Sequence, residues 1–302
     1  MILAIGEILF DMFPGGRRLG GAAFNFSYHI HRLDGPLRFL SRIGMDAEGE
    51  AIERFLTEQH FPCDDLQRDP NHPTGRVNVT LDPQGRPDFD IVTGVAYDFV
   101  TPTPAIERFV SQSCRLIYFG SLVQRTAQGA RTVRHILQHR SPRTKCLFDV
   151  NLRPDGYNDE ILAFSLRATD LLKLSEEELD VLAAMHGLSG NTADRVTALM
   201  AHFDIAMVAL TRGSQGSSLF AGDARRDIRP RGEVAVRDTV GAGDAFAAML
   251  AVGYLRGWPT ERILSLADRL ATAVCGIEGA VPADVRFYAP FRQALALESN
   301  HG

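Results

Sequence analysis

The segment 238–246 contains residue types that can transfer a phosphoryl group. Its sequence, Asp-Thr-Val-Gly-Ala-Gly-Asp-Ala-Phe, runs into the apolar stretch Ala245–Leu255, which is typical of a buried helix. Because Gly241 and Gly243 let the backbone turn tightly, successive amides can point at one spot beside the positive end of that helix. Such an arrangement binds anions. Asp244, in the first helical turn, is then placed to accept a hydroxyl proton as a phosphoryl group arrives.

Alternatively, Asp244 only caps a helix after a glycine-rich loop, an arrangement that stabilises a helix by about 1 kcal/mol. The complete segment favours catalysis, because it resembles the second signature of the ribokinase-like (PfkB) carbohydrate kinases, D-T-x-G-A-G-D-x-F, at every fixed position. The resemblance implies that Asp244 is the catalytic base for a sugar hydroxyl. It also implies that the amides of Gly241, Ala242 and Gly243 hold the γ-phosphate of ATP.

Segments near the start of the chain supply candidate ligands for a sugar. Residues 20–25, Gly-Gly-Ala-Ala-Phe-Asn, resemble the family's G-G-x-x-x-N. Paired glycines allow close backbone approach, and the Asn25 amide can both donate and accept hydrogen bonds. Upstream, the segment 6–11 is expected to end the first strand with Asp11, whose carboxylate can bind two hydroxyls. Glu7, in the same segment, is explained equally well as a functional acid or as a charge at the end of a strand. The expected sugar ligands here are Gly20, Gly21, Asn25 and Asp11.

The segment 149–154 resembles the D-x-N-x-R motif of fructokinase-type members. The resemblance implies that Asn151 binds the sugar and that Arg153 stabilises the transferring phosphate or contacts the sugar. A surface ion pair is an equally good interpretation of Arg153. This segment follows an apolar run, so we expect it at the carboxyl end of a strand, where open α/β sheets bind ligands.

The segment 173–178 resembles the family's K-x-N-x-x-E, with Ser175 in place of the asparagine. The resemblance implies that Lys173 and Ser175 contact the nucleotide, the serine more weakly than an asparagine would. It also implies that Glu178 organises Mg²⁺ through water. Acids that open a helix also complement its dipole, which is the alternative role for Glu178.

Two later segments resemble the nucleotide-binding part of the family. Residues 211–216 resemble its T-x-G-x-x-G loop, although an ordinary hairpin turn has the same composition. Near the C-terminus, Asp268 stands where many members carry asparagine or histidine beside adenine. The implied nucleotide contacts are Thr211, Gly213, Gly216, Asp268 and Gly279.

The resemblance also bears on monovalent cations. Asp238 aligns with a ligand for such an ion. Ala283, however, stands where ribokinase itself has a serine that closes its potassium site. The sequence therefore argues against activation by K⁺.

Short apolar runs that alternate with helical patterns must position these motifs. The expected strands are Ile2–Ile5, Leu37–Leu40, Leu116–Phe119, Leu147–Val150, Leu171–Leu174 and Met207–Leu210. The expected helices include Ala22–Leu33, Ala47–Gln59, Ala127–His139, Glu176–Met185 and Thr192–His202. This alternation predicts an α/β fold, doubly wound, in which a mostly parallel sheet lies between two helix layers, as in ribokinase.

One region departs from this alternation. In Gly75–Val100, apolar residues alternate at 77, 79 and 81, a turn is expected at 82–85, and the alternation resumes at 89 and 91, as in a β-hairpin. We expect this hairpin, joined by the segment 10–20, to form a small β-sheet lid over the sugar. No internal repeat or linker is evident, so residues 1–302 are expected to form one domain with the lid, 10–20 and 74–100, as an insertion.

Composition excludes several other classes of protein. The formal charge of −5 provides no positive field for nucleic acid. Neither of the two lysines, Lys145 and Lys173, follows a glycine-rich turn, so no Walker A loop is present. The four cysteines are too far apart for a zinc site or a disulfide scaffold. Without a leader or an apolar run long enough to span a bilayer, we expect a cytoplasmic protein that has no membrane partner.

These observations predict a kinase that uses ATP and Mg²⁺ to phosphorylate a small sugar. The segments 6–11 and 149–154 look most like fructokinases, which favours D-fructose, phosphorylated at its terminal hydroxyl. Ribose, 2-keto-3-deoxygluconate, another ketose or a nucleoside are the alternative acceptors. The intact Asp244 motif disfavours a noncatalytic sugar-binding protein. A dinucleotide oxidoreductase lacks support, because no G-x-G-x-x-G follows the first strand. An uncovered lid face would favour a homodimer sealed by β pairing.

Overall fold

The computed structural model describes residues 1–81, 87–154, 156–229 and 235–296. Within them, a nine-stranded sheet runs in the order β13-β12-β11-β10-β9-β8-β1-β4-β5. The strands from β11 to β5 pair in parallel, and β12 and β13 are antiparallel, which confirms the predicted, mostly parallel sheet. The bounds are β1 Ile2–Ile5, β4 Leu37–Gly44, β5 Leu66–Asp69, β8 Leu116–Gly120, β9 Lys145–Asp149, β10 Leu171–Ser175, β11 Met207–Thr211, β12 Ser217–Ala221 and β13 Ala224–Ile228.

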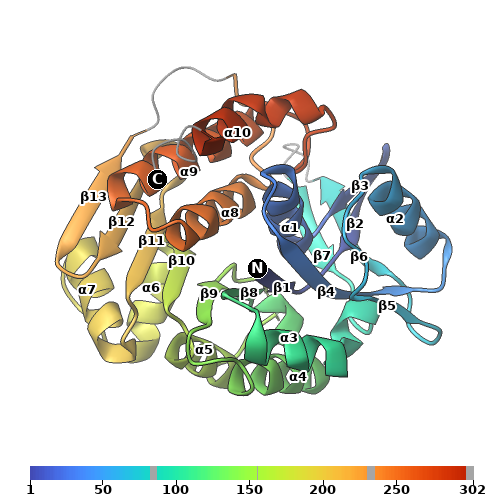
Figure 1. The fold of residues 1–302 in the computed structure, drawn as a ribbon, viewed down its shortest axis with the longest axis horizontal. Coiled ribbons are helices and arrows are strands. Elements are labelled where there is room, and N and C mark those ends of the chain that lie inside the picture. The colour runs from blue at the N-terminus through green and yellow to red at the C-terminus, as the bar shows by residue number, and fades with distance from the viewer. Residues whose placement is uncertain (82–86, 155, 230–234, 297–302) are drawn as a thin grey trace.

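Two helix layers cover the sheet, one on each face (Figure 1). The first layer consists of α1 Ala22–Arg32, α2 Ala47–Glu58, α8 Ala242–Leu255, α9 Thr260–Cys275 and α10 Ala289–Ala296. The second consists of α3 Pro104–Gln112, α4 Ala127–Gln138, α5 Asp159–Arg167, α6 Glu176–His186 and α7 Thr192–Phe203. In β1, Ile2 and Ala4 pack into the first layer, and Leu3 and Ile5 pack into the second. Burial on both faces explains why these strands read as unbroken apolar runs.

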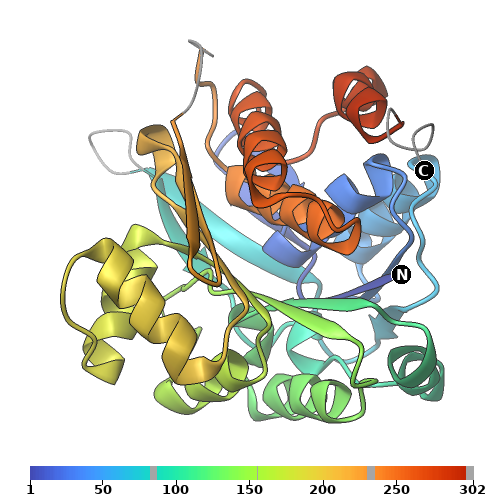
Figure 2. The same cartoon turned by 60° about the vertical axis from the view of Figure 1, so that its left-hand side comes forward.

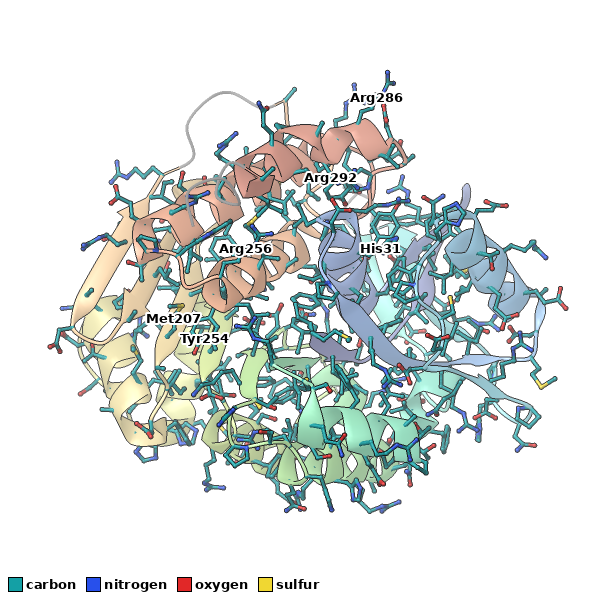
Figure 3. All side chains as sticks on the ribbon, in the orientation of Figure 1. His31, Met207, Tyr254, Arg256, Arg286 and Arg292 are labelled. Atoms are coloured by element: carbon teal, nitrogen blue, oxygen red, sulfur yellow. The ribbon has the colours of Figure 1, made fainter. Side chains whose placement is uncertain are left out.

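Helix α8 is the most deeply buried helix of the first layer. All of its residues from Asp244 to Gly253 are buried, and it packs against α1 and α9. Arg256, one residue beyond its end, donates to the carbonyl of Leu295 on α10 (2.9 Å). Arg292 on α10 donates in turn to the carbonyl of Arg32 at the end of α1 (2.7 Å). Figure 3 labels Arg256 and Arg292, and both lie among the helices of the first layer. These two bonds tie the C-terminal end of α8 to α10, and α10 to the end of α1.

The predicted lid is a separate four-stranded sheet with the order β3-β2-β6-β7. Its strands are β2 Leu9–Phe13, β3 Gly16–Gly20, β6 Gly75–Leu81 and β7 Pro87–Ile91. It projects from the main sheet beside α1, as Figure 2 shows. Strand pairing ends at Ile91, and the segment Ala96–Phe99 is a 3₁₀ helix rather than part of the lid sheet. The turn expected at 82–85 lies outside the described residues.

The extent of the domain and the oligomeric state stay predictions: one domain over 1–302, and a homodimer sealed through the lid. Within the part of the chain that the structure describes, no helix has the length and apolar character needed to cross a bilayer.

Phe26 is expected to be essential for seating α1 on the sheet. Its ring stacks on that of Tyr118 from β8, with centroids 3.8 Å apart, and neither side chain is exposed. Replacing Phe26 with alanine leaves a cavity, so we expect Phe26→Ala to lower the free energy of unfolding by about 3–5 kcal/mol. Urea denaturation measures the change. As a control, Val181→Ala on exposed α6 should stay within about 0.5 kcal/mol of the parent, and an equal loss in both variants would contradict the packing argument.

Candidate active site

Asp244 lies at the centre of a buried polar cluster where α1 and α8 meet. Its side chain is 9% exposed, and Nδ2 of Asn25, 219 residues away in the chain, donates to its Oδ2 (2.8 Å). Burial raises the pKa of Asp244, whereas the nearby Lys173 charge and the bond from Asn25 lower it. Oδ1 of Asn25 is buried and has no hydrogen-bond partner in the described structure. This oxygen is free to accept a hydrogen bond from a hydroxyl of a ligand beside Asp244.

The glycine turn before Asp244 packs closely against two other segments of the chain. Gly241 adopts φ +81°, and a Cβ on it would lie 2.4 Å from the Cβ of Ala280. A Cβ on Gly243 would lie 2.9 Å from Nζ of Lys173. The Ala242 amide already donates a long bond, 3.4 Å, to the carbonyl of Thr239. The amides of Gly241 and Gly243 are thus the better anion donors at this helix N-terminus.

Lys173 places a fixed positive charge beneath this turn. It is 7% exposed, and its Nζ lies 2.9 Å from Oδ1 of Asp149, whose Oδ2 accepts from the hydroxyl of Tyr118 (3.3 Å). Burial alone would lower the pKa of Lys173, but the carboxylates of Asp149, Glu178 and Asp244 outweigh it and raise that pKa. Lys173 therefore stays charged next to the place where phosphate charge would develop. The same burial raises the pKa of Asp149 to about 6.

The residues predicted to bind sugar surround the start of α1 and the lid. Gly21 caps α1 with φ +108°, where a Cβ would meet the carbonyl oxygen of Glu7 at 2.7 Å. The Glu7 carboxylate is buried and accepts from the amide of Ala23 (3.4 Å), so it caps the helix that carries Asn25. Burial raises the pKa of Glu7.

The predicted position of Asp11 at the end of the first strand is wrong. β1 ends at Ile5, Gly6 turns the chain away, and Asp11 lies within lid strand β2, opposite Arg18 on β3. Asp11 nevertheless faces the site, because a Cβ on Gly20 would lie 2.9 Å from its Oδ2. Burial raises the pKa of Asp11 to about 6, although the nearby charges of Arg153 and Arg18 lower it.

Asn151 and Arg153 lie in the loop after β9. Asn151 has φ +38°, a left-handed conformation that asparagine tolerates better than most residues, and its carbonyl accepts from the hydroxyl of Ser121 (3.2 Å). Arg153 is exposed, yet its charge lowers the pKa of Asp11 and of Asp244. Its guanidinium therefore faces the same site from the solvent side.

Ser175 and Glu178 are engaged with each other at the start of α6. The Ser175 hydroxyl accepts from the Glu178 amide (3.2 Å), while Oε2 of Glu178 accepts from the Ser175 amide (2.7 Å). Oε1 of Glu178 accepts from the amide of Leu152 (2.8 Å), which ties the Asn151 loop to α6. This is a capping box, a role at the helix start that differs from the dipole complement expected as the alternative for Glu178.

The residue set fits a magnesium ion held mainly by phosphate and water. Within the described ranges, no group of three or more His, Cys, Asp or Glu side chains could hold a metal ion alone. Mg²⁺ prefers oxygen ligands, keeps several waters and commonly binds substrate phosphates. The Glu178 carboxylate, with further lone pairs beyond its two amide bonds, suits the predicted contact through water.

The segment 211–216 joins two antiparallel strands, β11 and β12, so the hairpin interpretation is correct for the backbone. Gly216 has φ +93°, and a Cβ there would lie 2.0 Å from the carbonyl oxygen of Ile228. Gly213, also at positive φ (+52°), opens the short 3₁₀ helix of the loop, and the Thr211 hydroxyl donates to the carbonyl of Leu174 (3.3 Å). Nucleotide binding by this loop stays a prediction.

Asp268, predicted to contact the nucleotide, and Asp238 lie in separate local hydrogen-bond arrangements. Asp268 on α9 is buried 3.5 Å from the Ser217 hydroxyl, and burial raises its pKa. Asp238, predicted as a cation ligand, accepts from the amides of Val240 and Gly279 (both 3.1 Å). Gly279 itself adopts φ +76°.

Four residues at or beside the site were missed or undervalued by sequence reasoning. The sequence marks Asp149 only as the first residue of a motif, and it explains Glu7 equally well as a ligand or as a charge at the end of a strand. Tyr118 sits in an apolar run, where nothing marks its hydroxyl as functional. Arg18 is one of two adjacent arginines in a lid strand, and only its tertiary contacts with Asp238 and Glu278 distinguish it.

Comparison with known proteins finds similarity over nearly the whole chain. The family model described as pfkB family carbohydrate kinase matches residues 14–285. The fructokinase of Escherichia coli is 29% identical over 316 residues, which cover 98% of this chain and 98% of that protein. A sugar kinase from Pyrococcus horikoshii in complex with ATP superposes with a TM-score of 0.77 at 25% identity, covering 93% and 94% of the two chains. Fructokinase from Xylella fastidiosa with bound ATP shares the fold, with a TM-score of 0.81 at 21% identity and coverage of 99% and 98%.

The packing of Gly241 generates a test with a matched control at the other end of α8. Gly257 also has positive φ (+68°), but a Cβ there would meet nothing within 4 Å. Alanine at either position strains the backbone by about 1–2 kcal/mol. Only Gly241→Ala should also displace the anion turn, lowering kcat by about 10²–10³-fold, as loss of a preorganised donor does. Steady-state kinetics decide, and equal kcat values for the two variants would contradict the assignment.

Proposed function

Since the chain belongs to the pfkB family of carbohydrate kinases and is an ATP-dependent sugar phosphotransferase, we propose that its acceptor is D-fructose, phosphorylated at the terminal primary hydroxyl. The names of several full-length relatives, including the fructokinases of Escherichia coli and Salmonella typhimurium at 29% and 28% identity, support this choice. Ribose, 2-keto-3-deoxygluconate and nucleosides are the competing acceptors in the test below.

One observation carries the proposal: Asp244 lies in the first turn of α8, directly after the glycine turn and in contact with Asn25. In a polyol, one hydroxyl can donate to Asp244 while a second hydroxyl donates to the free Oδ1 of Asn25. A group with several hydroxyls suits this site better than an isolated alcohol, because both buried acceptors then gain partners.

The residues divide the reaction between them. Asp244 accepts the hydroxyl proton while the sugar oxygen bonds to the γ-phosphorus and the bond to the ADP oxygen breaks. The amides of the glycine turn and the Lys173 charge stabilise the negative charge on the phosphoryl oxygens. Arg153 approaches the same region from solvent. When bound, Mg²⁺ screens the charge of the ATP phosphates.

At the sugar end, Asp11, Asn25 and Asn151 supply acceptors and donors, and Gly20 and Gly21 leave room for close approach. At the nucleotide end, we assign the contacts to the 211–216 loop, Asp268 and Gly279. Lid strands β2 and β3 bring Asp11 over the start of α1, and a closed lid excludes water as a competing acceptor.

Asp244→Asn is the direct test of the base. The amide is isosteric and cannot accept the proton at neutral pH, so kcat should fall by about 10²–10⁴-fold with an unchanged thermal midpoint. Coupled ADP release is measured with fructose, ribose, 2-keto-3-deoxygluconate and adenosine. Turnover on nucleosides with none on fructose would overturn the proposed acceptor. Unchanged activity in the variant would remove Asp244 as the base.

Asp11 should make sugar binding dependent on pH. Its pKa is raised to about 6, so the carboxylate is mostly ionised at pH 7 and mostly protonated at pH 5. Because protonation removes acceptor capacity, the KM for fructose should rise roughly tenfold from pH 7 to pH 5, in proportion to the lost ionised fraction. Asp11→Asn should have a high and nearly constant KM over this range. The same pH slope in both proteins would exclude Asp11 as the titrating group.

A further inference from the structure

A single side chain of the lid contacts two loops of the main body. Arg18 lies on β3, and its Nη1 is 3.3 Å from Oδ2 of Asp238 in the loop before α8. Its Nη2 donates to Oε1 of Glu278 in the loop after α9. The guanidinium group thereby joins the lid to both loops.

These two loops shape the glycine turn. The Asp238 carboxylate is fixed by the amides of Val240 and Gly279, one from each loop. Gly241 packs so closely on Ala280 that a Cβ would lie 2.4 Å from the alanine Cβ. Movement of Asp238 would therefore act on the turn that carries the proposed phosphate donors.

Arg18 also has a defined position within the lid. It lies in register with Asp11 on the neighbouring strand. Its Cζ lies 4.6 Å from the centroid of the Phe13 ring, a cation–π contact on the same lid face. Two carboxylates from separate segments, and a ring beneath the guanidinium, distinguish this contact from an isolated surface ion pair, which contributes little.

We propose that Arg18 is a positioning residue that couples closure of the lid to the arrangement of the glycine turn beside Asp244. The inference rests on the proposed function in that the lid covers the sugar. With Arg18 in place, the lid and the turn move as one unit, and water is kept from the γ-phosphate. Without it, the lid opens independently, and water competes with the sugar as acceptor.

The neighbouring arginine is a matched control. Arg17 lies on the same strand with a similarly exposed side chain, 37% against 40%. It points to the opposite lid face, where it pairs with Glu48 of α2 (3.3 Å) and stacks 4.5 Å from the Phe10 ring centroid. Arg17→Ala removes the same charge and a comparable set of contacts, but it leaves the link to the glycine turn intact.

The first measurement is the ratio of fructose phosphate formed to ADP released, together with the fructose KM. We expect Arg17→Ala to keep a ratio near that of the parent. In Arg18→Ala the ratio should fall. The KM should rise about fivefold or more, because coupling between two sites typically changes affinity by at least about that factor. Arg18→Lys should lie between, because a point charge cannot bridge both carboxylates. Thermal midpoints should agree within about 4 °C. A normal ratio and KM in Arg18→Ala would overturn the proposal.

The second measurement does not depend on the sugar. Hydrogen exchange of residues 9–20 is followed with and without the non-hydrolysable ATP analogue AMP-PNP and Mg²⁺. The analogue should slow exchange in the parent and in Arg17→Ala, but not in Arg18→Ala. Absence of protection in the parent, or equal protection in Arg18→Ala, would overturn the proposal. If the parent does not phosphorylate fructose, only the proposed acceptor fails, and the exchange result still decides the role of Arg18.

Discussion

The structure depends on keeping several charges buried at one edge of a parallel sheet. Asp244, Asp149 and Lys173 are all at least nine-tenths buried, and an isolated buried charge is strongly disfavoured. The Lys173–Asp149 pair and the Asn25 amide compensate that cost, so that a carboxylate stays available beside the glycine turn. Within this pair, the loss of either charge would leave the other buried and without its partner.

The fold meets this requirement by fixing the backbone on which the charges stand. α8 is buried on all sides, and α1 and α9 pack along it, so the position of Asp244 is set by the packing of the core. Lys173 and Asp149 come from adjacent parallel strands, β10 and β9, whose carboxyl ends meet at the same edge. Open α/β sheets bind ligands at that edge for the same topological reason.

The lid adds charged side chains from a separate sheet to this site. Its strands carry Asp11 and Arg18, in register opposite each other, toward the start of α1 and the loops around the glycine turn. The apolar alternation of β6 and β7 was enough to predict the hairpin. The sequence could not show where Asp11 would lie, because Gly6 redirects the chain between β1 and β2, and a single glycine does not specify the direction of a turn.

The sequence by itself determined the alternation of strands and helices, the lid hairpin, and the Asp244 motif with its family. These are local patterns of apolar spacing, glycine and charge, and they can be read within a few residues of one another. The tertiary structure alone decided that Asn25 contacts Asp244, that Lys173 pairs with Asp149 under Gly243, that Glu178 caps α6, and that Arg18 reaches Asp238. Most of these contacts join residues far apart in the chain, and the exception is the capping box of Glu178, which is local but was not predicted. Their geometry follows from how whole helices and sheets pack, which no local pattern encodes.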